Sequence, residues 1–195
     1  MSLPISQYGE PVLRQRGAPI KSFDPALAAF ARDMLATMIE GEGIGLAAQQ
    51  VGQAVRLFVA DLLSRTSEAE PIRLDGKIIP PALLFPLTVV NPEVEYLPGG
   101  TKTVEEGCLS FPGIRGDISR PLAVKLRYQD LSGQPHVLET SGLLARVIQH
   151  EFDHVEGVLF IDRMDSSYLE SLEPKLKKLK RDTRAALKSL KTKKA

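Results

Sequence analysis

One segment in the second half of the chain has both a helix pattern and residue types that bind metals. Thr140 or Ser141 can cap a helix that runs to about Glu156, and Gly157 is typical of the residue that ends one. The apolar face of this helix is formed by Leu143, Leu144, Val147 and Ile148. Since a helix with such a face packs against a core, we expect the rest of the chain to fold around it.

His150 and His154 stand four residues apart in this predicted helix. Residues at that spacing project from one face, with Cβ atoms about 5–6 Å apart, so both imidazoles can reach one metal ion. Glu151 completes the pattern HExxH, in which a carboxylate beside the open position of the metal can take a proton from water. The alternative is a surface pair of histidines, because so short a pattern also arises by chance. The chain has only three histidines, which favours the metal site.

A catalytic tetrahedral site needs a third protein ligand, and its fourth position is left to water. The candidates are His136 and Cys108, which is the single cysteine of the chain and so cannot form an intrachain disulfide. A lone cysteine is more often a small buried apolar residue than a ligand. From the residues alone the third ligand therefore stays open, and a structural role for Cys108 is favoured.

Three separated segments resemble the signature motifs of one enzyme family, the peptide deformylases, and occur in the same order. They are GIGLAAQQ at residues 43–50, EGCLS at 106–110 and QHEFDH at 149–154. The similarity extends from residues 8–14 to residues 157–163 and so covers nearly the whole chain before its basic end. Any one motif could arise by chance, but the three together are specific.

The resemblance implies a site built around one divalent metal ion. Matched position by position, Cys108, His150 and His154 are the metal ligands, and His136 is left out. Iron(II) is the metal expected in the cell, and zinc, nickel or cobalt can occupy the same site. A thiolate with two imidazoles binds zinc more strongly than iron(II), so the choice would depend on cellular supply.

The resemblance also implies a reaction, the removal of the N-terminal formyl group from formyl-methionine of nascent polypeptides with release of formate. Water made nucleophilic by the metal attacks the formyl carbon, and Glu151 acts as general acid and base. Gln50 and the backbone N–H of Leu109 form the oxyanion hole, while Gly45 allows close approach of the substrate backbone.

The methionine side chain of the substrate is expected in an apolar pocket. The positions that match pocket-lining residues of the family are Ile44, Val104, Leu143 and Val147. Arg146 departs from the family pattern, in which this position is often apolar. Its stem could line the pocket while its guanidinium reaches solvent or an acidic partner, or it could be a solvated arginine beside the site. Arg115 matches an arginine found near the substrate backbone in relatives.

Two other functions compete with this interpretation. HExxH is also the hallmark of zinc peptidases, but these need a His or Glu ligand downstream of the helix, and no histidine follows His154. The second is a catalytically silent deformylase-like protein that binds ribosomes. The presence of Gln50, Cys108 and Glu151 argues against it, because loss of function would be expected to change such residues first.

The whole pattern predicts an α+β fold, with antiparallel or mixed sheets packed around the central HExxH helix and a further helix at the C-terminus. Asp24 and Pro25 start a helix that Gly41 ends. Strands are expected at residues 55–60, 87–90, 93–97, 122–128 and 135–139. Residues 61–86, rich in charge and proline, predict a surface loop. A last helix is expected from about Ser166, through or around Pro174.

The charge distribution separates the body of the chain from its C-terminal end. Residues 175–195 contain ten Lys or Arg and one Asp, so they carry +9 and the remainder carries −8. We expect one domain, with a catalytic part at residues 1–173 and a basic helical tail at 174–195. A basic helix is attracted to RNA phosphates, and bacterial relatives dock on the ribosome through their C-terminal helix. Ribosome contact through the tail is therefore a hypothesis.

The location of the protein is expected to be the cytoplasm of a bacterium. No stretch approaches the roughly 20 apolar residues needed to cross a bilayer, and the N-terminus resembles neither a signal nor a transit peptide. Formylated initiation implies bacteria or organelles derived from them. No membrane partner is expected.

Overall fold

Helix α1 (Pro25–Glu40) forms where the sequence predicts it, and its start shows why. The computed structural model describes residues 2–64 and 71–192, and in it Asp24 Oδ1 accepts a hydrogen bond from the Leu27 N–H at 3.0 Å. Pro25 occupies the first turn, where the backbone N–H would have no partner within the helix, so its absence costs no hydrogen bond. The helix buries Met34 and Met38 against the large sheet.

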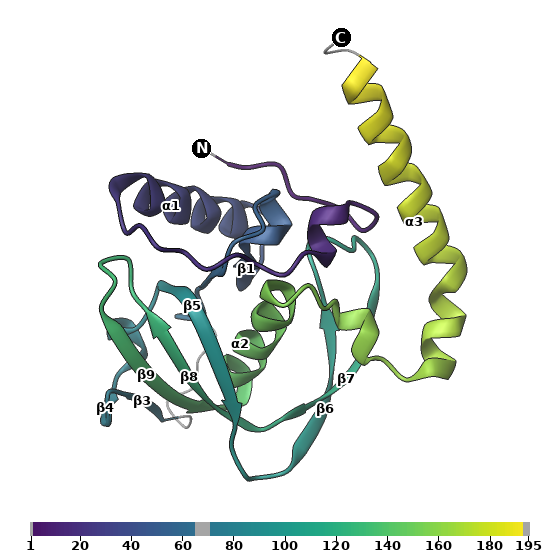
Figure 1. The fold of residues 1–195 in the computed structure, drawn as a ribbon. Coiled ribbons are helices and arrows are strands. Elements are labelled where there is room, and N and C mark those ends of the chain that lie inside the picture. The colour runs from purple at the N-terminus through teal and green to yellow at the C-terminus, as the bar shows by residue number, and fades with distance from the viewer. Residues whose placement is uncertain (1, 65–70, 193–195) are drawn as a thin grey trace.

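A seven-stranded antiparallel sheet forms the larger part of the molecule (Figure 1). Its strand order is β1-β2-β5-β8-β9-β3-β4. The strands are β1 (Gly45–Ala47), β2 (Leu57–Ala60), β3 (Ile72–Leu74), β4 (Lys77–Ile79), β5 (Leu87–Tyr96), β8 (Ala123–Gln129) and β9 (Pro135–Ser141). Short 3-10 helices connect the elements at Pro11–Arg14 (η1), Ala48–Val51 (η2), Pro81–Leu83 (η3) and Phe160–Arg163 (η4). With the helices described below, this sheet confirms the predicted α+β fold.

The prediction for residues 61–86 was wrong in part. Strands β3 and β4 form a hairpin within this stretch, and β3 pairs with β9 at the edge of the sheet. Ile72, Leu84 and Phe85 are buried in the core. These strands were not predicted because each has only three residues, too few to show the alternation of apolar and polar residues, and because charged and proline residues surround them. Residues 65–70 lie outside the described part of the chain.

The strands predicted at residues 87–90 and 93–97 are one strand, β5. Its register against β8 shifts between Val90 and Glu93, where Asn91 has a positive φ of 51°. This irregularity interrupts the side-chain alternation, so the sequence pattern divides the strand in two.

Helix α2 (Gly142–Val155) lies between the large sheet and a second, two-stranded sheet (Figure 1). The second sheet is the antiparallel hairpin of β6 (Thr101–Gly107) and β7 (Arg115–Pro121), which the sequence analysis did not predict. Leu144 and Ile148 pack with Phe58 and Leu126 of the large sheet. Ser141 precedes the helix as expected, although its side chain makes no capping hydrogen bond.

Helix α3 (Ser166–Thr192) is continuous through Pro174 and extends away from the body (Figure 1). Its first half packs on a second core cluster, in which Leu172 and Leu176 contact the group that contains Phe111 and Phe160. Within the described residues, no helix combines the length and the apolar character needed to cross a bilayer. The proposed division at residues 173 and 174 falls inside this helix and stays a prediction.

Candidate active site

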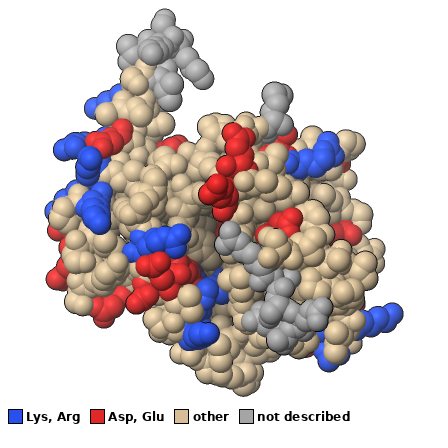
Figure 2. Space-filling model, turned by 180° about the vertical axis from the view of Figure 1, so that it is seen from behind, with Lys and Arg blue, Asp and Glu red and all other residues tan. Residues whose placement is uncertain are grey.

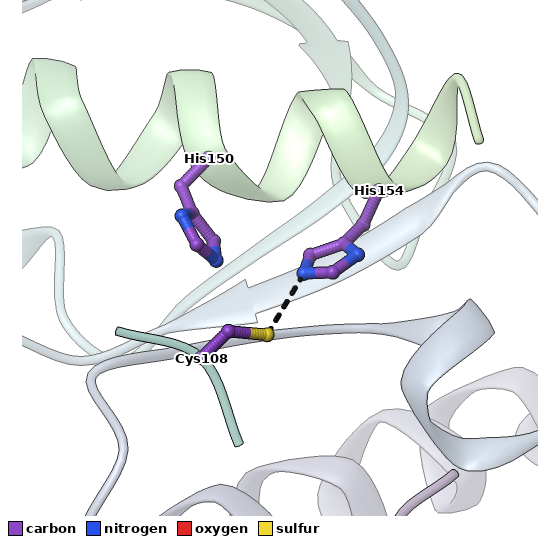
Figure 3. Close-up of side chains that lie close together, drawn as sticks. All are labelled: Cys108, His150 and His154. Carbon is purple, nitrogen blue, oxygen red and sulfur yellow. Dashed lines mark hydrogen bonds between the residues drawn. The ribbon is translucent and has the colours of Figure 1, made fainter. Parts of the chain in front are cut away.

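A thiol and two imidazoles converge between α2 and the end of β6. His150 and His154 project from one face of α2 toward Cys108, which directly follows β6 (Figure 3). Their ligand atoms all lie within 4.8 Å of one another, and Cys108 Sγ is 3.3 Å from His154 Nε2. Sulfur and imidazole nitrogen are the donors that suit zinc and related divalent metals, so this group fits a metal ion.

The surroundings of the two histidines shift their pKa values in opposite directions. Burial alone would lower the pKa of His150, but the adjacent Cys108 sulfur and Glu106 carboxylate raise it to about 10. Burial and the charge of His150 hold the pKa of His154 well below its usual value. Both imidazoles would bind a metal ion in their neutral form.

The Glu106 carboxylate orients His150 and is itself held by two arginines. Its Oε2 accepts hydrogen bonds from His150 Nδ1 at 2.9 Å and from Arg120 at 3.0 Å. Its Oε1 accepts from Arg120 Nε at 2.7 Å and from Arg146 at 2.6 Å. Although burial acts to raise it, the pKa of Glu106 is lowered to about 2 by His150 and Arg120. Since Nδ1 of His150 faces the carboxylate, its Nε2 is the atom left for a metal.

A second buried ion pair extends this network along α2. Arg120 donates to Asp153 at 2.9 Å, and Arg163 of η4 donates to the same carboxylate at 2.7 Å. Both Arg120 and Asp153 have side chains no more than 5% exposed. Charges this deeply buried are stable only when paired and hydrogen-bonded, so the network ties β7, α2 and η4 together.

Gln50 presents its amide N–H group to the site. Its Oε1 accepts a hydrogen bond from the Ala47 N–H at 2.8 Å, which fixes the orientation of the side-chain amide. Its Nε2 then lies 3.3 Å from Cys108 Sγ and 3.4 Å from Ser110 Oγ. The short helix η2, directly after β1, places this residue, which is 2% exposed.

The Glu151 side chain is buried beside the ligand group. Among the described residues, its Oε2 has no hydrogen-bond partner. Burial raises the pKa of Glu151 to about 7, against the charges of His150 and Arg120, which lower it. A cation held next to it would lower this pKa further. A buried carboxylate whose pKa is set by such opposing influences is a candidate general acid and base.

Gly45 makes room for that carboxylate. A Cβ atom at Gly45 would lie 2.3 Å from Glu151 Oε1 and 2.8 Å from its carboxyl carbon. Non-bonded heavy atoms do not approach that closely, so a side chain at position 45 would displace Glu151. The GIGLAAQQ segment thus contacts the HEFDH segment directly.

A cavity of about 560 Å³ opens onto these residues. Twelve of the thirteen site residues expected from the sequence line it: Ile44, Gly45, Gln50, Val104, Cys108, Leu109, Arg115, Leu143, Arg146, Val147, His150 and Glu151. His154 lies behind this lining, 1% exposed. His136, the other candidate ligand, is on β9 and bonds Asp75 at 2.8 Å, away from the cavity.

The architecture and the site can be compared with known proteins. Residues 2–169 match the model of the family described as polypeptide deformylase. The chain belongs to the peptide deformylase family. Members of this family are enzymes that remove N-terminal formyl groups in a metal-dependent reaction. The resemblance of the three sequence motifs is thereby confirmed.

Individual peptide deformylases match over nearly the whole chain. A peptide deformylase of Opitutus terrae is 50% identical over 196 residues, which cover 96% of this chain and 98% of the relative. A plant peptide deformylase superposes with a TM-score of 0.80 at 36% identity, covering 94% and 92% of the two chains. A peptide deformylase from Synechococcus elongatus in complex with actinonin superposes with a TM-score of 0.75 at 40% identity, and the match covers 89% of this chain and 87% of that one.

Sequence reasoning missed the buried charge network of this deformylase. Glu106 was identified only as part of a motif, and no role was predicted for Arg120 or Asp153. The burial of β7 alternates along the strand and puts Arg120 on the same face as the buried Ile118, but the residue types RGDISRP do not alternate between apolar and polar, so this face could be recognised only from the structure. A charged residue at a core position of a strand indicates a buried partner, although not which one.

Proposed function

We propose that this chain removes the formyl group from the N-terminal formyl-methionine of nascent polypeptides and releases formate. The observation that carries the proposal is the convergence of Cys108, His150 and His154 beside the buried Glu151, next to one cavity that Cys108, His150 and Glu151 line. This arrangement brings together metal-binding donor atoms and a buried carboxylate that can act as a base, which are the groups that metal-assisted hydrolysis requires. A peptidase activity is the competing outcome, because it would use the same HExxH elements.

Cys108, His150 and His154 would hold one divalent metal ion. We propose iron(II) as the metal in the cell, with zinc, nickel and cobalt able to bind the same three atoms. The proposal is supported by the donor types, by their separation of less than 4.8 Å and by the orientation of His150 through Glu106. When bound, the metal would lower the pKa of water and supply positive charge near the developing oxyanion.

Glu151 would act as the proton carrier of the reaction. It accepts a proton from the attacking water on its free carboxylate oxygen and returns this proton to the leaving amine. This role is supported by the burial of Glu151, by its raised pKa and by its Oε2, which has no hydrogen-bond partner in the described part of the chain. Gln50 Nε2 and the Leu109 N–H would stabilise the negative oxygen that develops on the formyl carbon.

The cavity would receive the methionine side chain and the peptide that follows it. We propose an apolar contact surface for the thioether chain, made by Ile44, Val104, Leu143 and Val147, which line the cavity. Gly45 would allow the peptide backbone close to the reacting atoms. Arg115 is largely exposed at the same cavity, next to Glu105, and would meet the substrate backbone beyond the first residue.

Release of formate from formyl-Met-Ala-Ser by protein purified anaerobically with iron(II) would test the proposal. We expect formate and an intact Met-Ala-Ser peptide, and no cleavage of an unformylated peptide. Backbone cleavage without formate would identify a peptidase instead. Neither activity, with metal shown to be bound, would support the silent ribosome-binding alternative and contradict the proposal.

We further propose that helix α3 contacts the ribosome and that the protein acts in the cytoplasm of a bacterium. Lys and Arg side chains line this projecting helix (Figure 2, upper left). Lys175, Lys178 and Arg184 are exposed on it. RNA phosphates attract such a surface without regard to base sequence. Contact with the ribosome would place the enzyme near emerging formylated chains.

Replacing Lys175, Lys178 and Arg184 by Gln should reduce co-sedimentation with ribosomes at low salt. Binding should also depend less steeply on salt concentration, because the variant can lose up to about three phosphate contacts and each contact contributes to the slope of log affinity against log salt. Truncation after Glu173 would be a poorer test, because Leu176 is buried against the body. The matched control is Lys125, Arg127 and Lys77 changed to Gln on the large sheet. Equal sedimentation of the helix variant and the unchanged protein would contradict the hypothesis.

A further inference from the structure

The hairpin that leads into Cys108 has little support from backbone pairing. Within residues 2–64 and 71–192, β6 and β7 pair only with each other and not with the large sheet. A two-stranded hairpin by itself is only marginally stable in water. The residues after Cys108 are held from the other side by the N-terminal segment, where the Tyr8 N–H donates to the Ser110 carbonyl at 2.9 Å. Since Cys108 directly follows β6, the position of its sulfur depends as well on what holds this hairpin against α2.

Side chains supply that attachment. Gln149 of α2 donates to the carbonyl of Pro121 at the end of β7, at 3.0 Å. Arg120 of β7 donates to Asp153 of α2 at 2.9 Å. Both of these contacts hold β7. His150 of α2 also bonds the Glu106 side chain of β6 at 2.9 Å, but none of the three contacts reaches the backbone of β6.

Arg146 reaches both strands. From α2 its guanidinium donates to the Ile118 carbonyl on β7 at 3.0 Å and to the Lys102 carbonyl on β6 at 2.5 Å. A third bond, at 2.6 Å, goes to Glu106, which in turn holds His150. The Arg146 side chain is only 12% exposed, so it is not a solvated arginine at the rim. The planar fork of arginine donors suits acceptors spread over two strands, whereas lysine offers a single point charge.

We propose that Arg146 is a positioning residue that fixes the β6–β7 hairpin on α2 and so sets Cys108 against His150 and His154. This inference rests on the metal site of the proposed function. Two of its three bonds fix the hairpin backbone, and the third fixes the carboxylate that orients His150. Arg146 lines the cavity, but it acts on the reaction through the ligand geometry and makes no contact with the reacting atoms.

The test compares metal retention in the unchanged protein, Arg146→Met and Arg146→Lys. Methionine keeps an unbranched stem in the cavity wall and removes the guanidinium, and lysine keeps the charge and loses the fork. Each protein is loaded with nickel(II), and transfer of the metal to excess chelator is followed by absorbance. Because outer partners of metal ligands typically change affinity by 10 to 100-fold, we expect Arg146→Met to lose metal about tenfold faster. Arg146→Lys should fall between the two.

Two further readouts distinguish positioning from substrate contact. The thiolate absorption of the cobalt(II)-loaded variant should shift, because the sulfur moves relative to the metal. In formate release, kcat should fall while KM for formyl-Met-Ala-Ser changes little. The matched control is Arg127→Met on β8, whose arginine is half-exposed and pairs with Glu95, and it should leave all three readouts unchanged.

The inference would be overturned if both Arg146 variants lost metal at the rate of the parent protein and gave the same cobalt spectrum. An increase in KM alone would indicate direct contact between Arg146 and the substrate instead. If Arg146→Met does not fold, Arg146→Lys carries the test by the same criteria. An unchanged protein that binds no nickel or releases no formate would overturn the proposed function itself, so the two failures are distinguishable.

Discussion

Replacing Glu151 by Gln is expected to lower kcat for formate release by about 10² to 10⁴, the usual contribution of a general acid or base. At about 1.36 kcal/mol for each factor of ten, this is about 3–5 kcal/mol of transition-state stabilisation. Glutamine has nearly the same shape, so it fits beside Gly45. Its amide cannot accept a proton from water or return one to the leaving amine. The Oε2 atom that would do so is buried and unpaired among the described residues.

Steady-state formate release and the metal content of the purified variant would check this result. Metal content should not change, because Glu151 is not one of the three converging ligand residues. Glu139→Gln on β9 is the matched control, since it removes a carboxylate that pairs with Lys125 outside the cavity. Activity of Glu151→Gln within a few-fold of the unchanged protein would remove Glu151 from the proposed mechanism.

Changing Cys108 to Ser is expected to weaken metal binding by more than about 100-fold and to reduce formate release to background. Outer partners of metal ligands already change affinity by 10 to 100-fold, and loss of a ligand should exceed that effect. A serine hydroxyl does not ionise near neutral pH, so the two imidazoles would be left without an anionic ligand. Metal stoichiometry after gel filtration, and affinity by competition with a chelator, would measure the loss.

His136→Gln is the control that makes the Cys108 experiment decisive. His136 was the other candidate for third ligand in the sequence, and its ring bonds Asp75 and Asp130 at the surface of the sheet. We expect this variant to bind one metal ion and to release formate like the unchanged protein. Loss of metal in His136→Gln, with retention in Cys108→Ser, would reverse the assignment of the third ligand.

Local patterns in the sequence were sufficient to predict the helices and most of the large sheet. The cap at Asp24 and the apolar face of residues 143–148 act within one or two helical turns, so they can be read from the sequence directly. The β6–β7 hairpin was missed for two reasons. Five of the seven residues of β6 are exposed, and the buried face of β7 is made of Gly116, Ile118 and Arg120, of which only Ile118 is a large apolar residue. That pattern does not resemble an amphipathic strand.

For the site, the motif residues were predictable and their connections were not. His150, Glu151 and His154 are close in sequence, so helical geometry alone brings them together. The approach of Cys108, and the bonds from Arg120 and Arg146 to Glu106, depend on how the hairpin docks on α2. Such contacts between distant segments follow from packing of the whole fold, which no local pattern encodes.

The packing of α3 also bears on the order in which the protein can mature during its own synthesis. Phe111 and Ile114, in the loop that follows Cys108, share a core cluster with Leu172 and Leu176. Losing a buried leucine contact of this kind typically costs about 2–5 kcal/mol. A growing chain reaches the end of α2 well before Leu176 is added. The loop that follows the sulfur can therefore reach its full packing only after the residues of α3 as far as Leu176 have been added to the chain.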